Sequence, residues 1–181
     1  MSNNLIRKYG DPILREVCKP VGKVSETERK IFTTMIELMD SNEGIGLAAP
    51  QIGISRRIIV AKFDGYLLKL IDPRIIEKKG EEILTEGCLS IPEVYIKVPR
   101  AKKIKIQALD EDGKTRVIQA DGMLSRIIQH EVDHLNGILI IDYATEKEKD
   151  KVKNQLKRIK THTKMILKVK NKAFSSMDKA I

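Results

Sequence analysis

The sequence predicts an α+β protein in which antiparallel sheets surround one central helix and another helix forms the C-terminus. Two observations support this fold class. Residues 45–120 contain a series of short apolar runs typical of strands, and a helical segment with two histidines follows them. Strands that precede the histidine-containing helix, instead of alternating with helices, are typical of α+β domains. With 181 residues, the chain is long enough to form a single core.

The first predicted helix begins near residue 26. Ser25 and Glu28 have the spacing of a capping box, in which two side chains bond backbone N–H groups at a helix start. Apolar residues then recur at helical spacing, and a polar stretch that ends in glycine at 41–44 marks the end of the helix. The apolar positions are Ile31, Phe32, Met35, Ile36 and Met39.

Strands are expected between this helix and the histidine pair. Their apolar runs lie at 57–61, 67–71, 83–85, 104–109 and 115–118. The Asp-Glu-Asp-Gly stretch at 110–113 is typical of a turn between the last two. The helix that carries the histidines is expected from about residue 121 to residue 135.

His130 and His134 lie four positions apart, so on a helix both imidazoles share one face and can reach a single metal ion. Glu131 directly follows the first histidine. There its carboxylate would lie beside a metal-bound water and move protons to and from it. The pattern therefore predicts a hydrolytic metal site on the central helix. Two helix histidines with ordinary hydrogen bonds are the alternative.

A third metal ligand has to come from elsewhere in the chain. Ile140 occupies the position where a longer form of the motif has a third histidine. Glu146 and Glu148 lie among lysines at the expected start of a helix, and His162 lies in a lysine-rich segment. The two glutamates are expected to be solvated, and His162 is expected to be solvated or weakly packed.

The chain has two cysteines, too few for a disulfide scaffold. Cys18 has no acid–base partner nearby in the sequence and is expected to be a small buried apolar residue. Cys88 lies in a Gly-containing turn between apolar strands, from which a side chain can point inward. Its thiolate and the two imidazoles would form a three-ligand set with a fourth position open for water. Another buried thiol is the alternative.

Three separated motifs resemble those of the peptide deformylase family, and they occur in the family's order. They are Gly-Ile-Gly-Leu-Ala-Ala-Pro-Gln at 44–51, Glu-Gly-Cys-Leu-Ser at 86–90 and Gln-His-Glu-Val-Asp-His-Leu-Asn-Gly at 129–137. Shorter similarities at 9–14 and 98–101 extend the resemblance over most of residues 5–143. It implies a catalytic domain over 1–144, with 145–181 as a basic C-terminal helix and tail of the same domain.

The resemblance also implies roles for individual residues. The implied metal ligands are Cys88, His130 and His134. Glu131 would act as general base and then as general acid. The side-chain N–H of Gln51 and the backbone N–H of Leu89 would stabilise negative charge on the reacting carbonyl oxygen. For Gln51 considered alone, a polar residue at a strand end is the alternative.

Three further positions follow from the same resemblance. Glu86 and Arg100 would form an acid–base pair that braces the turn at Cys88, with two unrelated surface charges as the alternative. Asp133 lies between the two histidines, where it would accept a hydrogen bond from a ligand imidazole or be solvated. The sequence does not decide between these two roles.

The substrate pocket implied by the resemblance is an apolar slot for a methionine side chain. Its positions are Ile45, Met123, Arg126 and Ile127. Arg126 would contribute its aliphatic stem and turn its charge to water. Gly46 and Gly87, together with Gly44, would let an extended peptide approach the backbone and add as a strand.

The implied activity is removal of the N-formyl group from the N-terminal methionine of new polypeptides, with release of formate. Fe²⁺ is the metal expected in nature, and a thiolate with two imidazoles also suits Zn²⁺, Ni²⁺ or Co²⁺. A basic RNA- or ribosome-binding protein that keeps a structural metal but lacks catalysis is one alternative, disfavoured by Glu131 and Gln51. A zinc endopeptidase is another, disfavoured by Ile140 and Cys88.

Basic charge is concentrated at the C-terminus. Residues 145–181 hold 12 Lys and Arg against four acids, whereas residues 1–144 hold 22 against 21. Thr145 and Glu148 form a second capping-box pattern, and residues 173–181 are expected to be frayed. The helical spacing is visible at Val152, Leu156, Ile159 and Ile166. The resemblance implies that this helix contacts the ribosome, and a solvated lysine-rich helix is the alternative.

The sequence contains no apolar run of the ~18–20 residues that a membrane span needs, and its start lacks a signal-peptide pattern. A cytoplasmic protein with neither a membrane nor a DNA partner is therefore expected.

Overall fold

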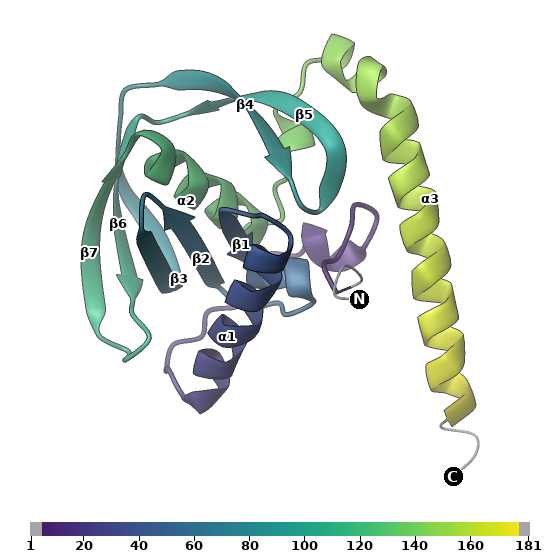
Figure 1. Ribbon diagram of the computed structural model, residues 1–181, viewed down its shortest axis with the longest axis horizontal. Helices are drawn as coiled ribbons and strands as arrows, with labels where there is room; N and C mark the ends of the chain where they lie inside the picture. Colours follow the sequence, from purple (N-terminus) through teal and green to yellow (C-terminus); the bar gives the residue numbers. More distant parts are fainter. Residues whose placement is uncertain (1–4, 178–181) are drawn as a thin grey trace.

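The architecture is α+β, as the sequence predicts. A computed structural model describes residues 5–177, and the side chains of residues 5–169. Figure 1 shows α2 (Gly122–Leu135) surrounded by strands, with α1 (Glu26–Ser41) and the long α3 (Glu146–Met177) on the outside. Both predicted capping boxes are present, one at Ser25 and Glu28 and one at Thr145 and Glu148.

Within residues 5–177, seven strands form two antiparallel sheets. The first sheet has five strands in the order β1-β2-β3-β6-β7, and the second pairs β4 with β5. The bounds are β1 Gly46–Ala48, β2 Ile58–Phe63, β3 Tyr66–Lys79, β4 Glu82–Cys88, β5 Ile91–Arg100, β6 Lys103–Leu109 and β7 Thr115–Asp121.

The five predicted strands are all present, most of them within longer elements, but β1 and β5 were not predicted. Pro92 and Pro99 lie in β5, and proline disfavours a strand because it has no N–H to donate. The evidence for the strand is its period of two. Val94, Ile96 and Val98 are buried, and the residues between them are exposed.

The five-stranded sheet is covered by a helix on each face. Along β2, Ile59 and Ala61 belong to the apolar cluster beneath α2, whereas Ile58 and Val60 belong to the cluster beneath α1. Cys18 is buried in the α2 cluster, as expected for a small apolar residue. The other side of α2 contacts the β4–β5 hairpin, so the histidine helix lies between the two sheets.

The end of α2 is fixed by a hydrogen-bonded cap. The N–H of Ile138 donates to the C=O of Asp133, and the N–H of Gly137 donates to the C=O of His134. This pair of bonds is a Schellman motif, which needs a left-handed residue directly after the helix. Gly137 supplies it with a φ of 70°. The cap ends the helix just after the second histidine.

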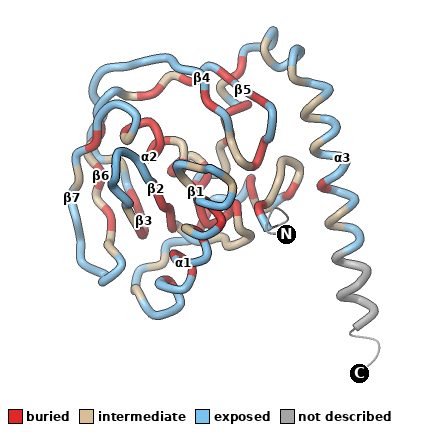
Figure 2. Tube along the Cα trace, in the orientation of Figure 1, coloured by how far each residue is buried: buried red, intermediate tan, exposed pale blue. Residues whose placement is uncertain are grey.

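One stripe of α3 packs on the body, and most of its other described side chains are exposed. Val152, Leu156 and Ile159 contact the apolar cluster around β5. Figure 2 shows the remainder of its described length largely at the surface. The helix continues to Met177, so the prediction of fraying from residue 173 is wrong as far as Met177. No glycine or proline interrupts 146–177. Residues 178–181 lie outside the described part.

Among the described residues, every helix is too short or too polar to cross a membrane.

Candidate active site

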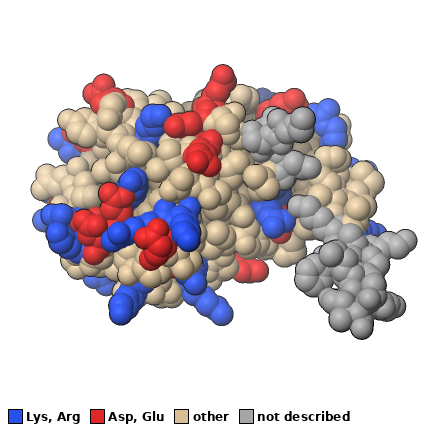
Figure 3. All heavy atoms as spheres, turned by 60° about the horizontal axis from the view of Figure 1, so that its bottom comes forward, with Lys and Arg blue, Asp and Glu red and all other residues tan. Residues whose placement is uncertain are grey.

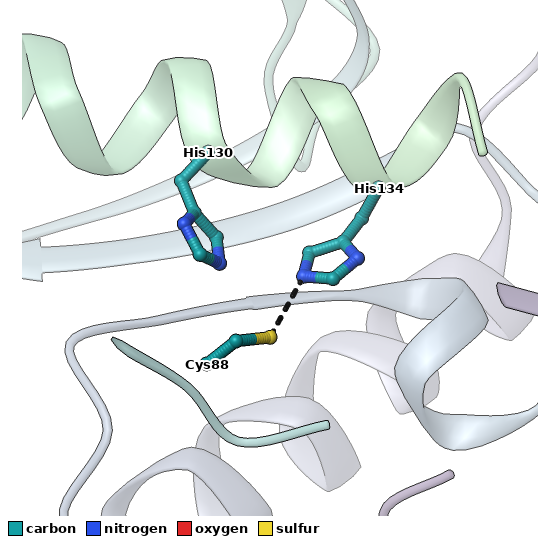
Figure 4. A group of neighbouring side chains, drawn as sticks. All are labelled: Cys88, His130 and His134. Carbon is teal, nitrogen blue, oxygen red and sulfur yellow. Dashed lines mark hydrogen bonds between the residues drawn. The ribbon is translucent and has the colours of Figure 1, made fainter. Parts of the chain in front are cut away.

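Cys88, His130 and His134 meet between β4 and α2. Figure 4 shows both imidazoles extending from α2 toward the cysteine. The possible ligand atoms of the three residues lie within 4.8 Å of one another, and Cys88 Sγ is 3.3 Å from His134 Nε2. A tetrahedral ion with bonds of about 2.0–2.3 Å separates its ligand atoms by about 3.3–3.6 Å. The three donors therefore fit one metal ion.

A β-bulge aims the cysteine. Glu86 pairs with Ile96 and Cys88 pairs with Ile91, with an irregularity in register between them. Such bulges turn a side chain away from its regular direction. Gly87 lies in β4 opposite the extra residues of β5, and a Cβ on it would lie 3.0 Å from the ring of Tyr95. A larger residue at this position would therefore push Tyr95 or the metal-binding strand aside.

The buried carboxylate of Glu86 links the cysteine strand to the histidine helix. It accepts two hydrogen bonds of 3.0 Å from Arg100, one of 2.7 Å from Arg126 and one of 2.9 Å from His130 Nδ1. Burial raises the pKa of Glu86, but the bonds from His130 and Arg100 outweigh it and lower the pKa to about 2. Because the ionised carboxylate can only accept, Nδ1 is the protonated nitrogen and Nε2 is free to bind metal.

The prediction that Arg126 turns its charge to water is wrong. The residue is 5% exposed, and its guanidinium donates to Glu86 and to the backbone C=O groups of Val98 and Glu82. The physical reason is the buried carboxylate of Glu86, which lies beneath α2 and attracts the guanidinium. The position of Arg126 in the sequence does not reveal this partner. Its charge is compensated inside the protein.

Asp133 takes neither of the two roles considered from the sequence. Its carboxylate accepts hydrogen bonds from Arg100 and from the hydroxyl of Tyr143, the latter at 2.8 Å. The acid that bonds a histidine ring is Glu86 instead. Tyr143 was not singled out in the sequence, and its ring also lies 5.1 Å from the Arg100 guanidinium. No local pattern in the sequence identifies Tyr143, because its partners come from other elements.

Glu131 faces the space beside the three ligands. Burial and the nearby Cys88 thiolate raise the pKa of its carboxyl to about 7, against the lowering effect of the two imidazoles. Among the described residues, Glu131 Oε2 and His134 Nδ1 are the buried side-chain atoms that lack a hydrogen-bond partner. Buried polar atoms normally have one, so Oε2 is available to a water or a substrate.

The state of Cys88 also suits metal binding. Burial raises the pKa of its thiol, but the electrostatic influence of His134 and hydrogen bonds with both imidazoles lower that pKa well below its ordinary value. The thiolate is the form of cysteine that binds metal. The electrostatic surroundings of Cys88 therefore favour the thiolate, which is the form that can bind a metal ion.

Gln51 is buried on the other side of the cysteine. Its Oε1 accepts from the N–H of Ala48 at 2.8 Å, which fixes the direction of its amide group. Its Nε2 then points toward the hydroxyl of Ser90 at 3.2 Å and toward Cys88 Sγ at 3.7 Å. The structure thus brings a side-chain N–H of Gln51 close to the metal ligands.

The N-terminal segment joins Gln51 to the Leu89–Ser90 turn, a feature not found from the sequence. The N–H of Arg7 donates to the C=O of Gln51 at 2.7 Å, and Lys8 Nζ donates to the C=O of Leu89 at 2.7 Å. The N–H of Tyr9 donates to the C=O of Ser90 at 2.8 Å. Three consecutive residues therefore hold the positions of Gln51 and Leu89.

A cavity of about 730 Å³ opens over these residues. Its lining includes the substrate positions named from the sequence, which are Ile45, Gly46, Gly87, Met123, Arg126 and Ile127. Ile127 is a buried wall, whereas Ile45 and Met123 are exposed at the mouth. The cavity is large enough for an extended peptide with one side chain inserted.

A hydrolase that uses a metal ion needs three protein ligands, an open position and a proton acceptor beside it, and the fold brings these together. These features define the class as metal-dependent hydrolase. Residues 4–150 match the family model described as polypeptide deformylase. The chain belongs to this family.

Individual relatives agree with the family match. The chain is 50% identical over 141 residues to a peptide deformylase from Dictyoglomus thermophilum, covering 78% of this chain and 92% of the relative. The crystal structure of a Thermus thermophilus peptide deformylase has a TM-score of 0.83 and 38% identity, covering 88% of this chain and 98% of that one. An inhibitor complex of the Plasmodium falciparum enzyme has a TM-score of 0.79 and 39% identity, covering 85% and 97%.

Gly46 leaves the room that Glu131 occupies, so Gly46→Ala should impair catalysis. An added Cβ would clash with Glu131 Oε1 and lie 2.8 Å from Ile127 Cγ2. We expect kcat/KM to fall by about 10²-fold, since a displacement of about 1 Å at a reacting group can have this effect. Metal content should not change. Gly65→Ala, in the β2–β3 turn, is the control: its φ of 78° makes alanine strained, so stability should fall, but the open space around it should leave activity unchanged. A fully active Gly46→Ala enzyme would contradict this account.

Proposed function

We propose that this enzyme removes the formyl group from the N-terminal formyl-methionine of newly made polypeptides and releases formate. The observation that carries the proposal is the Cys88–His130–His134 set next to Glu131, inside a cavity of peptide size. The relatives are named peptide deformylases, and their name supports the same activity for this chain.

Cys88, His130 and His134 would hold one divalent cation. When bound, such an ion lowers the pKa of its water to about 7 and polarises the carbonyl that is attacked. We propose Fe²⁺ as the natural ion. Zn²⁺, Ni²⁺ and Co²⁺ suit the same thiolate and imidazole donors, so availability would influence occupancy.

Glu131 would carry the protons of the reaction. Its carboxyl has a pKa of about 7, so it can accept a proton from the attacking water and later donate it. The acceptor of that proton would be the amine nitrogen of the methionine, which leaves as the C–N bond of the formamide breaks. Formate is the other product.

Gln51 and Leu89 would stabilise the negative charge that develops on the formyl oxygen. The side-chain N–H of Gln51 and the backbone N–H of Leu89 are the proposed donors, and the N-terminal segment braces both. Loss of one such donor typically lowers the rate by ~10²–10³-fold.

The rest of the cavity would recognise the formyl-methionine. Ile45, Met123 and Ile127 form an apolar surface for a thioether side chain, and Arg126 adds its stem while its charge is bonded to Glu86. Gly46 and Gly87 leave the backbone open to an extended peptide. The bidentate pair of Glu86 and Arg100 would keep the cysteine strand in place.

The assignment is tested by release of formate from formyl-Met-Ala-Ser, with protein purified without oxygen and its metal measured in the same sample. We expect turnover that a chelator abolishes and that Fe²⁺ restores. Acetyl-Met-Ala-Ser should not be cleaved, since its extra methyl group would crowd the reacting carbonyl. Absence of turnover after reconstitution with iron, nickel and zinc would refute the assignment.

Glu131→Gln should separate metal binding from catalysis. Glutamine keeps the shape of the side chain but cannot take up the proton, so kcat should fall by about 10²–10⁴-fold. Metal content should equal that of the parent protein, because the three ligands are unchanged. Glu81→Gln, an exposed residue on the surface, is the control and should keep full activity. Retained turnover in Glu131→Gln would remove Glu131 from the mechanism.

We also propose that α3 contacts the ribosome, where the substrate is made. Of the net charge of +9, the segment 145–181 carries +8. Figure 3 shows one face of the molecule, on which basic and acidic side chains are intermixed outside the part drawn in grey. Packing of Val152, Leu156 and Ile159 on the β5 cluster supports treating 145–181 as part of the same domain as 1–144. Such a protein would work in the cytoplasm.

Neutralising exposed lysines of α3 tests this contact without unfolding the helix. The variant replaces Lys151, Lys153, Lys157 and Lys164 by Gln. We expect weaker binding to ribosomes at low salt and a shallower salt dependence. The slope of log K against log[salt] should fall by about 0.7–0.9 for each phosphate that the variant no longer neutralises.

The matched control replaces the exposed Lys23, Lys30, Lys102 and Lys114. An equal reduction of binding in both variants would refute a specific role for α3.

A further inference from the structure

A second hollow, of about 460 Å³, lies between α3 and the N-terminal segment. Its walls come from residues 6–11, from the start of β5 and from the middle of α3. In Figure 1 these three segments lie next to one another on the side of the molecule that carries α3. We call this hollow the α3 groove.

The α3 groove adjoins the active-site cavity. Lys8, Pro92 and Glu93 line both hollows, so one surface leads from the metal ligands to the helix. Lys8 is also the residue that bonds the C=O of Leu89 at 2.7 Å. The groove therefore begins next to the turn that carries a proposed oxyanion donor.

The wall that α3 contributes is partly apolar. The helical stripe that packs on the β5 cluster through Leu156 and Ile159 continues to Ile166 and Leu167, which are half-buried and line the groove. Ile6 lines the opposite side and is buried. Apolar walls with charged residues at the rim are typical of sites that bind extended peptides.

An ion pair joins the two sides of the groove at its boundary with the cavity. Arg158 of α3 donates to Glu93 at 2.7 Å, and both side chains are about 70% exposed. Exposed ion pairs contribute little to stability, about 0–1 kcal/mol. The pair can therefore open when a chain passes at little cost.

We propose that the α3 groove binds the downstream part of the polypeptide substrate, beyond the residues held in the active-site cavity. This inference rests on the proposed deformylase function. A new polypeptide is far longer than the cavity, and the surface shared through Lys8, Pro92 and Glu93 gives the chain a continuous path. The ligand would be an extended segment with apolar side chains, because α3 offers it a half-buried apolar wall at Ile166 and Leu167.

Peptides of two lengths test the groove. The probes are formyl-Met-Ala-Ser and a nine-residue peptide with the same start followed by a leucine-containing extension. Burial of one or two apolar side chains should lower KM for the long peptide by about tenfold. If the groove holds the extension equally in the ground state and the transition state, as proposed, kcat should not change.

The informative variant is Ile166→Ser with Leu167→Ser. It should remove most of the advantage of the long peptide and leave the kinetics of the tripeptide unchanged. The matched control, Met165→Ser with Val169→Ser, alters the same helix at residues that are exposed and outside the groove. The control should keep the full length effect. Circular dichroism and thermal unfolding check that α3 remains helical and docked in both.

The outcomes separate this proposal from the assignment of the enzyme. Equal KM values for the two peptides in the parent protein would overturn the proposal that the groove binds substrate. Formate release from the tripeptide would still support the deformylase activity. An equal decrease of the length effect in both double variants would also overturn it. A decrease confined to the groove variant supports it.

Discussion

The buried carboxylate of Glu86 is the interaction on which the active site depends. It joins β4, β5 and α2, because its partners are Arg100 at the end of β5 and Arg126 and His130 on the helix. A buried anion is tolerated only when it is paired, and removing one partner of such a pair typically costs about 3–5 kcal/mol. Arg100 extends the network to Asp133, the residue before the second histidine. The network therefore fixes strand and helix relative to each other, and with them Cys88, His130 and His134, the residues that could hold a metal ion.

A second set of contacts fixes the side of the cavity where the substrate carbonyl would lie. Gln51 lies in a short 3₁₀ segment after β1, and Leu89 follows β4, so the two proposed donors come from the ends of strands in different sheets. Backbone bonds from Arg7 and Tyr9 and the ammonium of Lys8 join them. Bonds between backbone groups do not depend on side-chain identity, which explains why this segment has an organising role without an obvious motif.

Much of the site was predictable because it is local in the sequence. The spacing of His130 and His134 determines their common helical face, and Cys88 became a candidate ligand through the Gly-containing turn and the family resemblance. The rest depends on contacts between distant elements. The buried charge of Arg126 follows from Glu86, 40 positions earlier, and the bond between Tyr143 and Asp133 requires the chain to fold back after α2. Strand β5 was missed because its two prolines obscured the alternation of buried and exposed residues.

The two faces of α3 differ in a way that fits an enzyme acting on chains as they are made. Its inner stripe first packs on the body and then, from Ile159 to Leu167, borders a groove that leads to the metal ligands. Its exposed surface carries lysines such as Lys153 and Lys157. Lysines suit a phosphate surface because they bind it without fixed geometry, whereas the apolar wall suits a peptide of varied sequence. One helix would thus bring the enzyme to the source of its substrate and guide that substrate toward Glu131.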